Sequence, residues 1–453
     1  MRDLRGAGGF VDESAFEVLR AASLTLVCGC VAALLLATPS WSDTPDAGAD
    51  VPTPDAGGVQ PAAPSPDLSE RHWYNQLPFI PVPEIAQDPD SGLTLGILPV
   101  WLSTDDENRI RRIIAPDVFY NPNFGAGFHG RIFDYPSEDN QWSLEAGASE
   151  RVERDFDAEY TLGRLREQRW SFNGSVIFDR NGSSRFFGIG NSTPQRNETN
   201  FTNQQELVQL QVGLNFSRAW QLLYTARFRV IDVLPGTLSK IASIEQRFPH
   251  VSGLGTNYEQ LNRLSIIYDT RDSFTAPRQG MTWVAYGGVA SRSGIFNDSL
   301  YGEAGVDGRV FWPINTQTVL ATHVSLRYLV SAHRVPFWAL SNIGGGQTEI
   351  GGGQPLRGFG DGRFYDRNSF SASAELRRTA FEFDAISHVE IEVAPFVDVG
   401  DVFAHGTSFP VKALHKVAGV GFRGIARPSV VGYVDIGYGS EGAAVFTGIN
   451  YPF

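Results

Sequence analysis

The sequence contains almost no cysteine and no second long apolar run. Its only two cysteines, Cys28 and Cys30, lie in an apolar segment near the amino terminus, so the remaining chain has no thiol for a disulfide or a thiolate metal site. No long apolar run follows residue 40, which excludes a helical membrane protein. The formal net charge is −13 and no basic stripe is visible. Nucleic acid is therefore not an expected partner, because phosphate binding requires clustered positive charge.

Alternating apolar and polar residues are abundant towards the carboxyl end. In segment 388–400 the carboxylates Glu390, Glu392 and Asp398 occupy even positions, and the odd positions are Val, Ile or Pro. Segment 369–377 separates in the same way, with Glu375 among its polar residues. Successive side chains of a strand face opposite sides, so Glu375 and Asp398 are expected to point towards one common polar face.

This alternation predicts an all-β fold, and two kinds of fold share it. Outer-membrane strands place the apolar face outward and the polar face in the lumen, whereas a soluble β-sandwich hides the apolar face. We interpret the pattern as a transmembrane antiparallel β-barrel. Seventeen candidate strands are found, although bacterial single-chain barrels have even strand numbers: 92–103, 111–121, 123–134, 140–151, 155–163, 169–178, 205–217, 219–232, 260–269, 280–290, 300–313, 316–330, 369–381, 387–400, 415–426, 429–438 and 442–453.

Three long connections interrupt the strands, at 179–204, 233–259 and 331–368. Structureless stretches of this length are commonly functional. The third contains Gly353-Gln-Pro-Leu-Arg-Gly-Phe359, in which Arg357, Gly358 and Phe359 stand within a glycine-rich environment.

Four motifs together resemble a known family. Leu356-Arg-Gly-Phe359, followed by Ala374-Glu375 and by Phe396-Val-Asp-Val-Gly400, is similar to the signature of BamA/TamA-like outer-membrane assembly and translocation barrels, the bacterial surface antigen superfamily. Segments 184–191 and 268–280 also resemble family features. The resemblance covers roughly residues 80 to 453.

The resemblance implies a location, an architecture and a function. It implies a sixteen-stranded barrel of the outer membrane, with loop 331–368 folded into the lumen. It places Arg357 against Glu375 and Asp398, and it makes Phe396 and Gly400 part of the strand motif. The implied function is insertion, assembly or translocation of proteins or lipids at the outer membrane, with outer-membrane lipids and a client protein as partners.

The region before the predicted barrel, residues 1–90, departs from the pattern of that family. Residues 1–42 are expected to be a signal peptide, 43–90 a disordered linker rich in Pro, Ala and Asp with a short lead-in, and 91–453 the barrel. This leaves no room for the POTRA domains that receive clients in most relatives. The protein is thus expected either to work with a separate periplasmic partner or to be a diffusion channel that shares the fold.

The final segment, 442–453, predicts a last strand, and the resemblance implies that this strand closes against the first at a weak seam. It ends with the aromatic residues Tyr451 and Phe453, which we interpret as the carboxy-terminal signal read by the barrel assembly machinery. Pro452 removes a ladder donor and is tolerated only at an edge or a strand terminus.

Signatures of catalysis and cofactor binding are missing. No pair of the eight histidines has zinc-ligand spacing, and no His-Glu-x-x-His occurs. Gly344-Gly-Gly-Gln and Gly351-Gly-Gly-Gln repeat without a following Gly-Lys-Ser/Thr, so glycine here more simply lets the loop fold back tightly. We expect no enzyme, metal or cofactor, and an embedded hydrolase stays as an alternative.

Overall fold

The computed structural model describes residues 80–104, 110–137, 139–274, 276–292, 299–330, 335–384, 388–405, 413–426, 430–449 and 451–453. The expected signal peptide and nearly all of the expected linker lie outside these residues. The first half of the barrel wall is built from β1 (Ile80–Asp88), β2 (Gly92–Thr104), β3 (Ile110–Ile114), β4 (Asp117–Asn121), β5 (Gly125–Asp134), β6 (Asn140–Ser149), β7 (Arg154–Leu162), β8 (Trp170–Asn181), β10 (Thr199–Asn215) and β11 (Trp220–Pro235).

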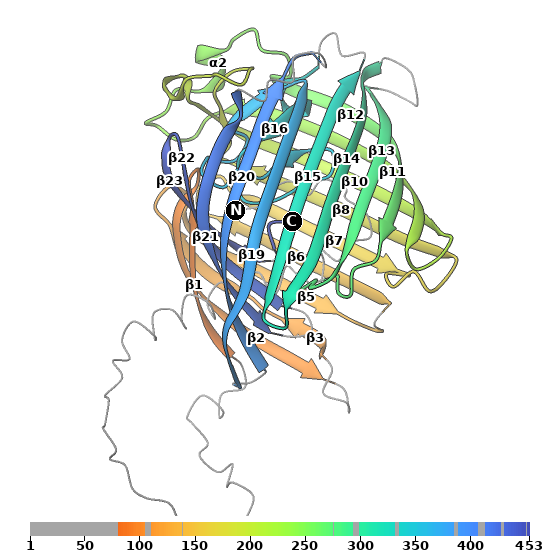
Figure 1. The fold of residues 1–453 in the computed structure, drawn as a ribbon. Helices are drawn as coiled ribbons and strands as arrows, with labels where there is room; N and C mark the ends of the chain where they lie inside the picture. Colours follow the sequence, from red (N-terminus) through yellow and green to blue (C-terminus); the bar gives the residue numbers. More distant parts are fainter. Residues whose placement is uncertain are drawn as a thin grey trace, which may run out of the picture.

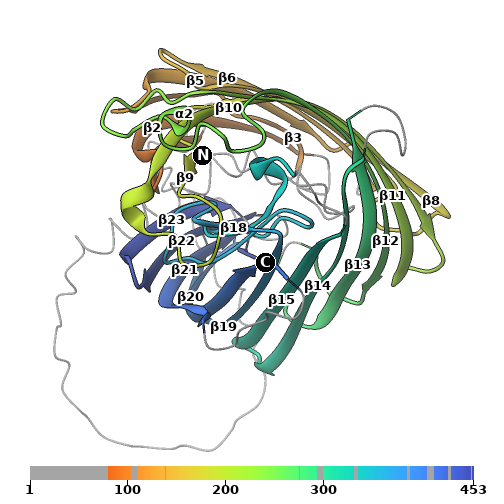
Figure 2. The ribbon, with the colours of Figure 1, turned by 90° about the horizontal axis from the view of Figure 1, so that it is seen from above.

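The wall continues with β12 (Gly255–Asp269), β13 (Gly280–Ser291), β14 (Ser299–Asn315), β15 (Thr318–Val330), β19 (Asn368–Asp384), β20 (His388–Phe403), β21 (His415–Ala426), β22 (Val430–Gly439) and β23 (Gly442–Ile449). Neighbours along the chain pair antiparallel, from β1 with β2 to β22 with β23. The strands form a ring (Figures 1 and 2). The predicted all-β antiparallel fold is confirmed.

One wall strand is interrupted by a proline. β3 and β4 both pair with β2 on one side and with β5 on the other, and Ala115 and Pro116 separate them. Proline has no N–H to donate, so the ladder breaks there. The amide of Ala115 still donates to the backbone oxygen of Arg131 at 2.9 Å. The two pieces therefore act as one strand of the wall.

The expected number of sixteen strands is not confirmed. Each of the seventeen predicted segments contributes to the described sheet, and β1 adds one more before residue 91. The barrel thus begins earlier than expected, within the segment assigned to the linker and lead-in. This strand contains Pro81 and Pro83, and proline within an apolar run argues against a central strand. In the described ladders β1 pairs only with β2, and an edge tolerates proline.

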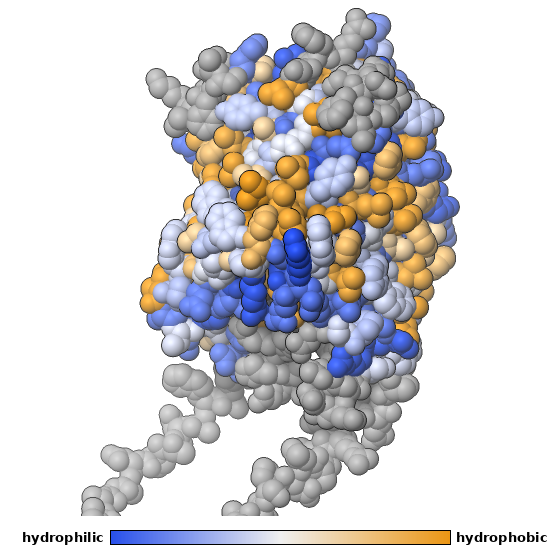
Figure 3. All heavy atoms as spheres, turned by 90° about the vertical axis from the view of Figure 1, so that its right-hand side faces the viewer, coloured by the Kyte–Doolittle hydropathy of each residue, from blue (hydrophilic) through white to orange (hydrophobic). Residues whose placement is uncertain are grey.

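The side-chain pattern of the wall agrees with a membrane-spanning barrel. Large apolar residues face outward, for example Leu210, Ile266 and Val397, which are 58%, 52% and 53% exposed. Figure 3 shows a band of apolar residues across the middle of one face, with polar residues below it. Inward positions are polar and buried, including Glu375 and Asp398. The predicted orientation of segments 369–377 and 388–400 is confirmed.

Connections between strands fill part of the interior. Within the described ranges they contain β9 (Arg185–Phe186), η3 (Gln195–Asn197), α2 (Ile244–Arg247), η4 (Phe337–Ala339) and a small sheet of β16 (Ser341–Ile343), β17 (Gly353–Gln354) and β18 (Phe364–Asp366). We call residues 335–367 the inner loop. Figure 2, which looks down the barrel, shows β18 inside the ring of strands. None of the helices in the described ranges is long and apolar enough to cross a membrane.

Candidate functional site: a buried arginine cluster

Arg357 is the centre of a charged cluster between the inner loop and the wall. Its side chain is fully buried, and its guanidinium binds Asp398 with two bonds, Nε to Oδ2 at 2.9 Å and Nη2 to Oδ1 at 2.7 Å. Nη1 donates to Glu375 Oε1 and, at 3.1 Å, to Asp435 Oδ2. A planar guanidinium suits this position because its fork can serve several carboxylates at once. The structure therefore brings Arg357 together with both carboxylates that the resemblance pairs with it.

Two further arginines complete the cluster. Arg423 donates to Glu375 Oε1 at 3.1 Å and to Asp435 Oδ1 at 2.5 Å, and Arg377 donates to Glu375 Oε2 at 2.9 Å. We call these six residues the arginine cluster: Arg357, Glu375, Arg377, Asp398, Arg423 and Asp435. Three cations face three anions, so the buried charge is balanced.

The carboxylates keep the loop arginine charged. Burial by itself lowers the pKa of Arg357, but Asp398, Glu375 and Asp435 outweigh it and raise that pKa well above its usual value. Asp435 and Arg423 are not among the site residues that the sequence predicts. The sequence contains a signal for Asp435. Tyr433 and Asp435 alternate with the apolar residues Val434 and Ile436, so the two faces of this strand differ in polarity. Arg423 had a comparable signal, because it stands on the face opposite the apolar residues Ala418, Val420 and Phe422 of the same segment.

The aromatic residues of the two motifs pack on this cluster. The Arg357 guanidinium lies 3.5 Å from the ring centroid of Phe396, a distance at which the ring face attracts the cation. Phe359 packs in an apolar group with Leu356, Ile343 and Phe364. Arg357 is thus held by charge on one side and by rings on the other.

The motif glycines allow close backbone approach. A Cβ at Gly358 would lie 2.7 Å from the Gly439 nitrogen, and a Cβ at Gly437 would lie 2.0 Å from the Arg357 oxygen. A Cβ at Gly400 would meet the Ile343 side chain at 3.1 Å. Only glycine at positions 358 and 437 leaves room for the inner loop to lie directly on β22, whereas a side chain at position 400 would press on Ile343.

A second group of charged residues holds the inner loop from the β12–β15 side, and sequence analysis did not identify it. Arg263 donates to the backbone oxygen of Ile350 at 2.9 Å, and Arg327 donates to that of Ala339 at 3.3 Å. Glu303 bridges the two arginines, at 2.7 Å and 3.0 Å. The loop is therefore held from two sides of the wall.

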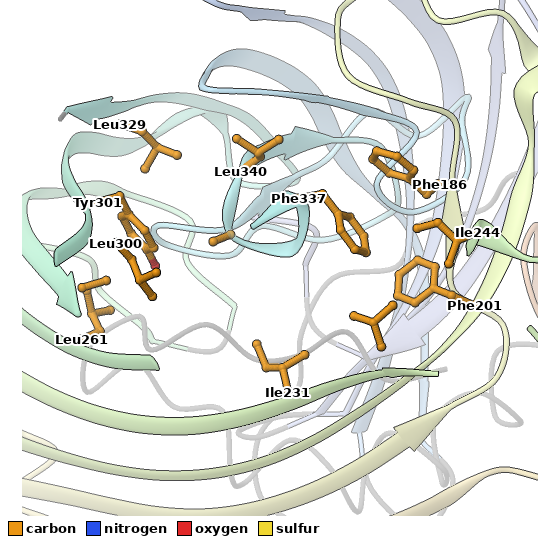
Figure 4. Packing of buried hydrophobic residues seen from close by; sticks show 13 residues of the cluster. Phe186, Phe201, Ile231, Ile244, Leu261, Leu300, Tyr301, Leu329, Phe337 and Leu340 are labelled. Atoms are coloured by element: carbon orange, nitrogen blue, oxygen red, sulfur yellow. The ribbon is translucent and has the colours of Figure 1, made fainter. Parts of the chain in front are cut away.

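An apolar cluster lies in the barrel interior and includes Ile244 of α2. It joins residues of all three long connections to the wall, and the labelled side chains point towards one another (Figure 4). We call it the apolar cap: Phe186, Phe201, Ile231, Val233, Ile244, Leu261, Ala290, Leu300, Tyr301, Leu329, Phe337, Ala339 and Leu340. Sequence analysis missed the cap, because its connection residues follow no period.

The two other family-like segments take different positions. In segment 184–191, Phe186 belongs to the apolar cap, and Phe187 lies under the guanidinium of Arg363, 4.1 Å from the ring centroid. In segment 268–280, Asp269 forms an ion pair with Arg271 at 2.8 Å. The first segment therefore reaches the interior site, and the second forms its own local ion pair.

Tyr451 and Phe453 do not continue the last strand as expected. β23 ends at Ile449, and the backbone of residues 451–453 is not part of a strand. Phe453 is 5% exposed and packs inside the barrel on Phe311, Val319 and Ala321. The proline before it cannot donate a ladder hydrogen bond, which is consistent with the chain leaving the wall here.

A cavity of about 210 Å³ remains between the inner loop and the opposite wall. Its lining includes Asn203 and Arg229 of the wall and Trp338 and Glu349 of the loop. No group of three or more His, Cys, Asp or Glu side chains suited to a metal ion occurs in the part of the chain that the structure describes.

Comparison with known protein families decides the identity of the fold. Residues 138–424 match the model of the Omp85 superfamily domain. The chain belongs to the Omp85 superfamily. The predicted resemblance is confirmed, and the protein is an outer-membrane β-barrel of this superfamily. Among the described residues, no POTRA domain is present.

Solved structures include similar barrels. A structure of BamA from Haemophilus ducreyi that lacks POTRA domains 1–3 is 14% identical, covers 78% of this chain and 74% of its own, and has a TM-score of 0.48. CdiB from Escherichia coli is 10% identical over 84% of this chain and 69% of its own, with a TM-score of 0.49. No curated protein matches the sequence.

Proposed function

We propose that the protein inserts, assembles or translocates proteins or lipids at the outer membrane and has no enzymatic activity. One observation carries this proposal: the barrel interior is occupied by an inner loop that is bound through the arginine cluster, through Arg263 and Arg327, and through the apolar cap. A constitutive diffusion channel needs a continuous aqueous path. An interior packed with an apolar core works against such a path.

The meeting of the first and last strands supports a route for the client. Gln87 of β1 donates its backbone N–H to Thr447 Oγ1 of β23 at 3.2 Å. Between these two strands, the described residues show no paired backbone ladder like those between the other wall neighbours. A seam without a ladder separates more easily than the rest of the wall, because backbone hydrogen bonds join paired strands. The client is proposed to engage this seam.

The partners are proposed on the same basis. The outward apolar residues bring outer-membrane lipids into contact with the wall, a separate periplasmic protein delivers the client, and the barrel assembly machinery inserts the protein itself. The aromatic residues Tyr451 and Phe453 are proposed to be read by that machinery before the barrel closes, since Phe453 is buried in the closed barrel.

Photocrosslinking in the native membrane tests this function. A photoreactive residue replaces Ile85 on β1, whose side chain is 40% exposed, and a matched control replaces Leu210 on β10. Adducts with one or a few envelope proteins at position 85, absent at position 210, are the expected result. Identical adducts at both positions, or none, would contradict a client at the seam.

The diffusion-channel alternative has its own measurement. In planar bilayers the wild-type protein should show low and infrequent ion conductance while the inner loop is in place. Steady conductance by the wild-type protein, together with no client adducts, would favour the channel.

A further inference from the structure

Residues 451–453 leave the barrel wall and lie in its interior, where Figure 2 places this end of the chain. We call them the tail segment. Each of its three residues contacts a different part of the structure, so the segment behaves as a ligand of the barrel. The contacts of the three residues define the site.

Tyr451 is bound through both its hydroxyl and its ring. The hydroxyl donates to Glu392 Oε2 of β20 at 2.7 Å. The guanidinium of Arg377 lies 3.6 Å from the ring centroid, within reach of a cation–π interaction. The ring also packs on Ala276 and Ile425. This half of the site therefore suits a phenol. Glu392 accepts the hydroxyl hydrogen, Arg377 lies over the ring face, and Ala276 and Ile425 pack on the ring.

Phe453 fills an adjacent apolar pocket. Phe311, Val319 and Ala321 of β14 and β15 form the pocket, and His323 stacks on the ring with a centroid distance of 5.2 Å. Arg377 reaches this residue too, because its Nη2 donates to the Phe453 backbone oxygen at 3.4 Å. One buried arginine therefore contacts both aromatic residues of the segment.

Pro452 connects the segment to the inner loop. Its backbone oxygen accepts a hydrogen bond from the Thr348 amide at 3.1 Å, and Thr348 belongs to the inner loop. The same Arg377 binds Glu375 of the arginine cluster at 2.9 Å. The end of the last strand is thus tied both to the loop and to the cluster that holds it.

We propose that this part of the interior is a binding site for a peptide of the pattern aromatic–X–aromatic, that the tail segment occupies it, and that its occupation locks the end of β23 to the inner loop. Release of the segment removes Tyr451 from both Glu392 and Arg377 and removes the Pro452 acceptor from Thr348. The last strand and the loop therefore loosen together. This site goes beyond the proposed function, because it does not depend on what the barrel transports.

Amide hydrogen exchange in the purified full-length barrel tests the lock. Arg377→Gln keeps both aromatic residues in the chain and removes the cation that contacts them. Exchange of the Thr348 amide is expected to be about tenfold faster in this variant, as for the loss of one ordinary hydrogen bond. Arg378→Gln, one residue along β19 and exposed to the outside, should leave that exchange unchanged.

The Arg357 amide distinguishes the lock from a general role of Arg377 in the cluster. That amide donates to Asp398 Oδ2 at 3.1 Å, whereas the tail segment approaches Arg357 through the Phe453 ring, whose centroid lies 6.0 Å from the guanidinium. The proposal predicts faster exchange at Thr348 with little change at Arg357. Equal acceleration at both amides, or no acceleration at Thr348, overturns it.

A second arm tests the binding site in trans. In a variant that lacks residues 451–453, the free peptide Asn-Tyr-Pro-Phe should restore slow exchange at Thr348 as its concentration rises. A peptide with alanine in place of both aromatic residues should not. A folded shortened barrel that the aromatic peptide fails to protect overturns the site. The Arg377→Gln arm uses the full chain and decides the lock even where the shortened chain does not assemble.

Discussion

The arginine cluster and the apolar cap both hold the inner loop inside the barrel, but with opposite chemistry. The cluster joins Arg357 of the loop to carboxylates on β19, β20 and β22. The cap joins apolar side chains from three connections, such as Phe186, Ile244 and Phe337, to the wall. The cluster concentrates the attachment of the loop in one side chain, whereas the cap distributes it over many.

This difference predicts different responses to damage. Removal of one member of a buried charge cluster leaves the others without a partner, which costs more than the lost bonds themselves. Removal of one member of an apolar cluster leaves a cavity that its neighbours partly refill. The cluster should therefore release the loop when Arg357, its one loop residue, is removed, whereas removal of any one residue should only weaken the cap.

The largest effect is expected for Arg357→Ala. Glu375, Asp398 and Asp435 would remain buried with one cation fewer, at a cost of about 3–5 kcal/mol in the free energy of unfolding. Urea unfolding in micelles measures the loss, and circular dichroism should show nearly unchanged strand content. Arg378→Ala on the outer face is the control. A loss no larger than in the control would contradict the central role of Arg357.

A double-mutant cycle of Arg357 and Asp398 tests whether the cluster acts as one unit. Asp398→Ala should resemble Arg357→Ala, and the double variant should be little worse than either single variant, because each change breaks the same bonds. Unfolding free energies of the four proteins give the coupling. Simply additive losses would show that the two residues stabilise the barrel independently.

Leu340→Ala tests the cap. Leu340 is 5% exposed, and its truncation should cost about 2–3 kcal/mol, in the lower part of the range for buried leucine because the cap lies among connections that can relax. Leu210→Ala, which faces lipid, is the matched control. Bilayer recordings should show more frequent ion conductance for Leu340→Ala alone. A loss equal to that of Arg357→Ala would remove the distinction between the two regions.

The smallest effect concerns Asp90, in the turn between β1 and β2. Its carboxylate accepts the Asp361 amide of the inner loop at 2.8 Å. Burial and the neighbouring Asp88 raise the pKa of Asp90 from 3.8 to about 8, against the opposing influence of Arg185. The protonated form is thus favoured in the folded protein, and its contribution to stability is lost as the pH rises from about 4 to about 8.

Asp90→Asn keeps a neutral acceptor at every pH and should remove this decline. Unfolding midpoints between pH 4 and pH 9 measure it: the wild-type protein should lose stability relative to the variant across that range. Parallel profiles for the two proteins would mean that Asp90 does not titrate there. In that case the contact between Asp90 and Asp361 would not add a pH-dependent attachment of the inner loop to those made by the arginine cluster and the cap.

How much of the site the sequence could predict differs between the two regions. The period-two alternation of segments 369–377 and 388–400 placed Glu375 and Asp398 on inward faces, and the motif of the long connection identified Arg357. The cap had no such pattern, because Phe186 and Phe337 lie on connections where neither a strand nor a helix period applies. A cluster on strands leaves a signal in the sequence, and a cluster on loops does not.

The predicted bounds of the first and last strands show a second limit of prediction from the sequence. The sequence places residues 80–88 in the lead-in, yet β1 pairs with β2 over its whole length. Residues 451–453 were assigned to the last strand, yet they lie inside the barrel. In both places the prediction from the local pattern was wrong, because the partners available in the folded barrel decide whether a segment joins the wall.

The sequence by itself determined which side chains of each strand face inward, since alternation is a property of the extended backbone and needs no partner. Its resemblance to a known family also singled out a loop arginine and two strand carboxylates. Only the tertiary structure decided that Asp435 and Arg423 join them, that three connections pack into a cap, and that the tail segment binds Arg377. Those contacts join residues far apart in the chain, and closure of the sheet into a ring is what brings their elements together.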